Sequence, residues 1–115
     1  SEAEVNTGKT WIDGKPIYKK TIAITSTISA PAGVTTKVVG AILDIDVPIK
    51  IYGAVAYHSD NAPYTWYQLG SHVDLEDKMW TGSTISAATG QVKLYVSNLT
   101  IGSGYITVEY TKKTN

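Results

Sequence analysis

The chain has 115 residues, which corresponds to one domain that is long enough to bury a hydrophobic core. Its ten basic residues are all lysines and balance ten acidic residues, so neither the net charge nor any arginine points to nucleic-acid binding. Cysteine is absent, which excludes disulfides and thiolate chemistry, and no apolar run has the ~18–20 residues of a membrane span.

The first third of the chain predicts strands joined by short turns. Residues 1–8 are polar and predict an extended arm or linker remnant, which leaves residues 9–115 as the folded domain. Asp13-Gly14 predicts a hairpin turn. Apolar and polar residues alternate over residues 18–28, as in a half-buried strand. We expect the Ala-Pro-Ala-Gly sequence at residues 30–33 to end that strand with a turn.

The middle of the chain continues the strand pattern. Residues 34–43 predict a second long strand with a kink or bulge at Gly40. After a polar break, alternation resumes up to residue 57, and Pro48 favours an edge position or a strand start because proline has no amide hydrogen to donate. The aromatic residues 64–69 predict a strand that crosses to the other sheet.

The last third is less regular at its start. Residues 75–79 fit one helical turn with Asp74 as its cap. Residues 84–88 predict a short strand, residues 98–104 a turn-rich link, and the alternating residues before and after that link two further strands. Seven or eight strands at this spacing predict an all-β, single-domain antiparallel β-sandwich, either jelly-roll or immunoglobulin-like.

The sequence lacks a recognisable catalytic or metal-binding pattern. His58 and His72 have Asp60 and Asp74 nearby, but neither histidine follows a known ligand spacing, so both are interpreted as loop residues. The acidic residues near Asp74 lack the spacing of a calcium-binding loop and are interpreted as solvated carboxylates. We therefore predict that the protein is not an enzyme and holds no metal or cofactor.

One group of residues has a functional interpretation, namely the aromatic residues in and around the least regular segment. The candidate ligand-binding residues are Tyr57, His58, Tyr64, Trp66, Tyr67 and Trp80. Exposed tryptophan and tyrosine rings stack on sugars or anchor protein interfaces. The alternative is that Trp66 and Trp80 fill the core of the sandwich, as large aromatic residues usually do.

The two ends of the chain resemble a known family. Residues 8–22, GKTWIDGKPIYKKTI, and residues 104–114, GYITVEYTKKT, are similar to the opening and closing segments of a small domain at the C-terminal end of many tailed-bacteriophage and prophage structural proteins, especially tail-fibre and receptor-binding proteins. Residues 34–47 share the composition of that family, whereas residues 52–89 match nothing specific in it. The opening motif looks structural, because its Asp-Gly turn joins two strands.

The resemblance implies a non-enzymatic virion domain of a phage tail, extracellular when functional, which contacts a glycan or protein receptor on a bacterial surface. Because such fibres are typically trimers, it also implies a possible homotrimer. Three alternatives stay open: a structural module that caps or trimerises a fibre, a carbohydrate-binding module of a secreted or phage-borne enzyme, and a small hydrolase that uses His58 or His72 with a nearby carboxylate. No nucleic-acid partner is expected.

Overall fold

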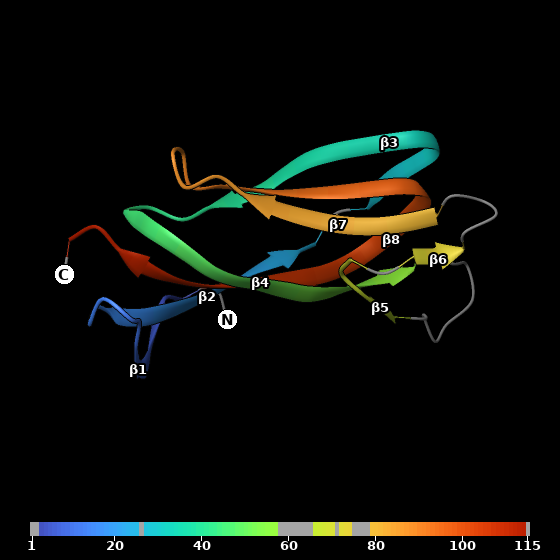
Figure 1. Cartoon of the computed structure of the whole chain (residues 1–115). Coiled ribbons are helices and arrows are strands. Elements are labelled where there is room, and N and C mark those ends of the chain that lie inside the picture. Colours follow the sequence, from blue (N-terminus) through green and yellow to red (C-terminus); the bar gives the residue numbers. More distant parts are fainter. Residues whose placement is uncertain (1–2, 26, 58–65, 71, 75–78, 115) are drawn as a thin grey trace.

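The computed structural model describes residues 3–25, 27–57, 66–70, 72–74 and 79–114, and these residues form eight strands (Figure 1). The strands are β1 (Val5–Thr10), β2 (Pro16–Ile24), β3 (Ile28–Ala41), β4 (Ile45–Tyr57), β5 (Trp66–Gln68), β6 (His72–Asp74), β7 (Met79–Ile85) and β8 (Gln91–Lys112). Each pairing between them is antiparallel.

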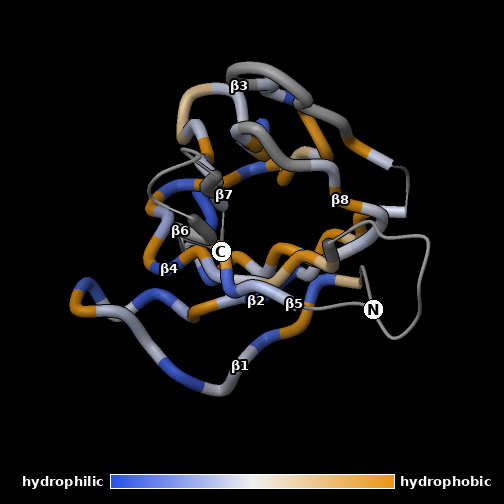
Figure 2. Tube along the Cα trace, turned by 90° about the vertical axis from the view of Figure 1, so that its right-hand side faces the viewer, coloured by the Kyte–Doolittle hydropathy of each residue, from blue (hydrophilic) through white to orange (hydrophobic). Residues whose placement is uncertain are grey.

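Two layers of strands face each other, and β8 belongs to both. The first layer has the order β1-β2-β8-β4-β5. The second consists of β3, β7 and β6, with β3 and β7 pairing with the first part of β8. Figure 2 shows the layers end-on, with β3 above and β1 and β2 below. The prediction of a single-domain antiparallel β-sandwich is confirmed.

The hydrophobic core lies between these layers. Alternating apolar residues of β8 are almost completely buried, both in the half that pairs with β3 and in the half that pairs with β2 and β4. The core consists of Ile22, Ile24, Ile28, Ile42, Ile45, Val55, Val92, Leu94, Val96, Ile101, Ile106, Val108 and Tyr110. Most of these are β-branched residues, which suit the pleated inner surface of a sheet.

The predicted link at residues 98–104 is wrong, because β8 runs without a break through this segment. Its partners change here: the pairing with β3 ends at Ile101, and the pairing with β2 begins at Gly104. A Cβ atom on Gly104 would lie 2.6 Å from the carbonyl oxygen of Ala54. The glycine therefore allows a close approach between β8 and β4 where β8 passes from one layer to the other, and does not end the strand.

The predicted turn at residues 30–33 is also wrong. These residues belong to β3, and a shift in the β3–β8 register between Ala30 and Val34 accommodates them within the strand. Strand β3 pairs with β8 in the same direction as β2 does, from Ile28 opposite Ile101 onward, so the chain continues along β8 from one layer to the other. The irregularity predicted at Gly40 is confirmed by a second register shift, where a Cβ atom would lie 2.9 Å from Cδ1 of Ile22.

Three smaller differences concern the edges of the sheets. Residues 5–8, expected in an arm, form most of β1, because they pair with β2 across the Asp13-Gly14 turn. Strand β5 pairs with β4 and so stays in the same sheet, whereas the sequence predicted that it crosses to the other one. Asp74, the expected helix cap, lies in β6, and residues 75–78 of the predicted helical turn lie outside the described residues.

The two segments that carry the family resemblance lie side by side. Strand β2 pairs with β8 from Tyr18 opposite Tyr110 to Ile24 opposite Gly104. In the turn before β2, Lys15 Nζ donates a hydrogen bond to Asp46 Oδ2 at 2.7 Å and another to the carbonyl oxygen of Lys112 at 3.3 Å. The opening segment thus ties β4 to the closing segment, which is a structural role.

The start of the chain is held against the same end of the sandwich by Glu4. The buried hydroxyl of Tyr110 donates a hydrogen bond to one oxygen of Glu4, and Lys112 Nζ donates to the other at 3.0 Å. Burial alone would raise the pKa of Glu4, but the hydrogen bonds from Tyr110 and Lys112 outweigh it and lower the pKa below its usual value of 4.5.

We expect Glu4→Gln to lower the free energy of unfolding by about 1 kcal/mol at pH 7, a modest value because a third of the side chain is exposed. A lowered folded-state pKa stabilises the fold above the unfolded-state pKa, and that contribution disappears as the pH falls through the folded-state value. The difference between wild type and variant should therefore shrink as the pH falls from 5 towards 2. Urea unfolding at each pH measures it, and a constant difference would contradict the prediction.

Candidate ligand-binding face

The outer face of the five-stranded layer carries exposed aromatic rings. Trp66 on β5 is 54% exposed and Tyr105 on β8 is 42% exposed. Between them runs β4, whose Ala54 pairs with Tyr105 on one side and with Gln68 on the other, while Ala56 pairs with Trp66. Small residues therefore separate the two rings, and nothing large rises from β4 between them. We call this side of the layer the aromatic face. By strand phase it comprises Thr21, Ala23, Lys50, Tyr52, Ala54, Ala56, Trp66, Gln68, Tyr105, Thr107 and Glu109, of which Ala56 and Thr107 are buried.

The spacing of the two exposed rings follows from the strand register. Trp66 lies on β5, two strands away from β8. Its partner on β4 is Ala56, two residues along from Ala54, which is the partner of Tyr105. With strands ~4.8 Å apart and ~3.4 Å per residue, the two Cβ positions are about 12 Å apart. Rings at this distance can each contact a different unit of an extended ligand.

Tyr52 is fixed in place beside these rings by polar contacts. Its hydroxyl donates a 2.9 Å hydrogen bond to Oε2 of Glu109, and Lys50 Nζ lies 5.0 Å from the centre of its ring. Burial and the neighbouring Glu109 carboxylate raise the pKa of Tyr52, so its hydroxyl stays protonated at neutral pH. Between β2 and β8, the hydroxyls of Thr21 and Thr107 are joined by a 2.8 Å hydrogen bond.

The structure places only some of the residues proposed from sequence. Trp66 lies on the aromatic face, but its neighbour Tyr67 points the opposite way and packs, half-buried, against the core. Tyr57 and Trp80 lie in β4 and β7, respectively, and their side chains are outside the described part.

The two remaining candidates from the sequence, His58 and Tyr64, lie outside the described residues altogether. The interpretation of His72 as a loop residue is wrong, because His72 begins β6 and pairs through its backbone with Trp80 of β7. The described part of the chain therefore brings one of the six proposed residues, Trp66, to an exposed position on the aromatic face.

Sequence reasoning missed Tyr52 and Tyr105. A signal for both was present, since each occupies the polar phase of its strand: Tyr105 alternates with the buried Ile106 and Val108, and Tyr52 is followed two residues later by Ala54 on the same face. A large aromatic residue in the polar phase of an amphipathic strand points to the solvent side of the sheet.

The described residues were also compared with the requirements of a metal site and of a membrane-spanning helix. These contain no group of three or more His, Cys, Asp or Glu side chains placed to hold a metal ion. Among the same residues, no helix is long and apolar enough to cross a membrane. No protein-family model, curated protein or solved structure matches the chain.

Proposed function

We propose that this chain is a non-enzymatic receptor-binding domain of a phage tail fibre or related virion protein, and that it contacts a glycan on a bacterial surface. The observation that supports binding most directly is the exposure of Trp66 and Tyr105 on one sheet face, separated by alanines. The phage context rests on the resemblance of residues 8–22 and 104–114 to that family.

The chemistry of the aromatic face favours sugar over protein as the ligand. Tryptophan and tyrosine faces stack on the C–H faces of sugar rings, and both residues bring a large contact area at a small cost in side-chain entropy. The hydroxyls of Thr21 and Tyr52 and the amide of Gln68 are arranged around these rings, where hydroxyl groups of a sugar can exchange hydrogen bonds with them. Weak binding at one such face becomes strong adhesion when a fibre presents several copies.

We expect Trp66→Ala and Tyr105→Ala each to weaken glycan binding by about 10- to 100-fold, in line with stacked aromatic residues at binding hot spots. Binding is measured on a glycan array and as adsorption of fluorescent protein to bacterial cells. Leu43→Ala is the matched control, because Leu43 is 83% exposed but lies in the turn between β3 and β4, away from the aromatic face. All three variants should unfold at nearly the wild-type urea concentration.

Two results would overturn this proposal. One is a wild-type protein that binds no glycan and no cells; together with a trimeric mass in solution, that result would favour a structural module that caps a fibre. The other is glycan binding that survives both aromatic substitutions, which would move the binding surface elsewhere. Hydrolysis of any bound glycan would contradict the non-enzymatic part of the proposal.

A further inference from the structure

The inner side of β2 and β8 carries donors that converge on one carboxylate. The Tyr110 hydroxyl donates to one oxygen of Glu4, and Lys112 Nζ donates to the other at 3.0 Å. Burial raises the pKa of Glu4, but these two hydrogen bonds and the positive charge of Lys20 lower it below its usual value of 4.5. The three side chains therefore favour a carboxylate in its charged form.

Strands β2 and β8 themselves hold these donors in place. Tyr110 is completely buried, and its ring centre lies 6.3 Å from that of Tyr18. Lys112 Nζ lies 4.8 Å from the centre of the Tyr18 ring, whose π electrons attract a cation. Lys20 faces the same side of the layer, because its cross-strand partner Val108 belongs to the core. We call Tyr110, Lys112 and Lys20 the carboxylate cradle.

Glu4, in contrast, reaches the cradle from a segment with little burial of its own. It precedes β1, whose six residues are exposed except for the partly buried Thr7. In the described part of the chain β1 pairs with β2 alone, and the register shifts between Asn6 and Thr10. The Glu4 side chain is itself one-third exposed. Its carboxylate can therefore leave the cradle without a change in the core.

A hollow with a volume of about 260 Å³ adjoins the cradle and leaves room for more than the Glu4 side chain. Ile42 and Leu43 give it apolar sides, and Asp44 adds a carboxylate. Asp44 Oδ2 accepts hydrogen bonds from the hydroxyl and the amide of Thr114, the latter at 3.2 Å, and a carboxylate can accept further ones. With Glu4 displaced, two lysines and one aspartate leave a net charge of +1 in the lining. The hollow suits a small molecule with one carboxylate and several hydroxyl groups.

We propose that the carboxylate cradle is a binding site for a small hydroxy acid such as a sugar acid, and that Glu4 occupies it in the absence of this ligand. The ligand's carboxylate replaces that of Glu4, and its hydroxyl groups donate to Asp44. Displacement of Glu4 releases the segment that leads into β1. The cradle lies on the inner side of β2 and β8 and the aromatic face on the outer side, so this inference does not rest on the proposed function.

Titration of ¹⁵N-labelled protein with sodium galacturonate tests the site, with galactose at the same ionic strength as the neutral control. Glu4→Ala opens the cradle, and we expect galacturonate to shift the amides of Lys20 and Lys112 in this variant. The wild type should show the same shifts, and a shift of the Glu4 amide, at about fivefold higher concentration, because only molecules with an open cradle bind. Galactose should shift none of these amides.

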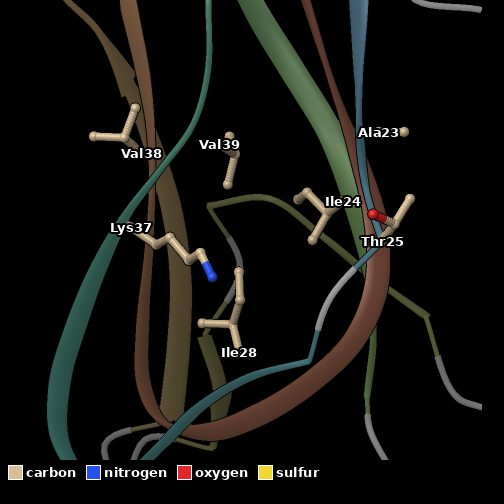
Figure 3. A pocket seen from close by; sticks show the side chains of 7 residues that line it. All are labelled: Ala23, Ile24, Thr25, Ile28, Lys37, Val38 and Val39. Atoms are coloured by element: carbon tan, nitrogen blue, oxygen red, sulfur yellow. The ribbon is translucent and has the colours of Figure 1, made fainter.

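Two further variants distinguish the cradle from a general attraction of anions to lysines. In the Glu4→Ala background, Tyr110→Phe removes the buried donor but keeps the ring, and should weaken galacturonate binding about tenfold. Lys37→Gln in the same background is the matched control and should leave binding unchanged. Figure 3 shows that the Lys37 amine also points between the layers, but into a separate cavity of about 140 Å³ whose one hydroxyl residue, Thr25, is exposed.

Each contrary outcome has a definite meaning. Equal affinity of Glu4→Ala and the wild type would overturn the role of Glu4 as the resident occupant. Binding of galactose as tight as that of galacturonate, binding that survives Tyr110→Phe, or no shift in either protein would overturn the carboxylate cradle as a ligand site. Oligosaccharides that end in galacturonic acid identify the source of the ligand: shifts of the cradle amides support a glycan, whereas shifts with galacturonate alone support a free acid.

Discussion

Replacing Gly53 with alanine is expected to leave the chain unfolded, or to lower its free energy of unfolding by more than about 4 kcal/mol. Gly53 lies in β4 opposite Ile106, and a Cβ atom there would lie 2.1 Å from the carbonyl oxygen of Tyr105 and 3.0 Å from Cα of Ile106. Both contacts are with backbone, so no side chain can rotate away. The β4–β8 ladder, which supports both the core and the aromatic face, would have to separate locally.

Circular dichroism during urea unfolding measures this effect, with Gly8→Ala as the control. Gly8 has a φ of 81° and no atom within 4 Å of an added Cβ, so its substitution costs only the strain of the left-handed conformation, about 1–2 kcal/mol. A loss of 4 kcal/mol is large against the ~5–15 kcal/mol that stabilises a domain of this size. If the two variants unfold at the same urea concentration, the close approach of β4 and β8 is not a requirement of the fold.

The strands themselves could be predicted because their alternation is local. The buried positions of β2 and of the last part of β8 follow period two in the sequence, and the Asp13-Gly14 turn is confirmed by the hydrogen bond from the Trp11 amide to the Lys15 carbonyl at 2.9 Å. Residues 30–33 and 98–104 were wrongly predicted to be turns, because their turn-forming residues were interpreted without knowledge of the neighbouring strands. Both segments lie within long strands that are paired on either side of them, and this tertiary pairing overrode the local turn preference.

The aromatic face was predictable in part. The sequence analysis selected Trp66 as an aromatic residue in the least regular segment. The outward position of Tyr105 follows from the alternation of β8, in which Tyr105 precedes the buried Ile106. The cavity lined by Ile24, Ile28 and Lys37 could not be predicted, because it forms where the end of β2 meets β3. Nothing in either strand's own sequence specifies that meeting, which depends on where β8 places both partners.

The terminal segments and Trp66 lie in different strands of the first layer. The segments that resemble the phage family include most of β2 and the end of β8, which pair with each other in the first layer. Trp66 is carried by β5, which lies beyond β4 at the far edge of that layer. Because Trp66 is exposed on an edge strand, we expect that it can be substituted without disturbing the core.

Tyr110→Ala should lower the free energy of unfolding by about 3–5 kcal/mol, as expected for the loss of a fully buried aromatic ring. Tyr110 is completely buried in the closing segment, and its ring centre lies 6.3 Å from that of Tyr18 across the β2–β8 pair. Its hydroxyl donates to Glu4, and burial together with this carboxylate raises the pKa of Tyr110 far above its usual value of 10. Urea unfolding at pH 7 measures the loss.

Tyr110→Phe separates the ring from the hydroxyl and should cost only about 1 kcal/mol, because water can replace the lost donor at the partly exposed Glu4. If the hydroxyl acts through Glu4, the double variant Tyr110→Phe with Glu4→Gln should lose less than the sum of the two single variants. Additive losses would show that the two groups stabilise the fold independently. A loss for Tyr110→Phe as large as that for Tyr110→Ala would place the stabilisation in the hydrogen bond that holds the start of the chain, and not in the buried ring.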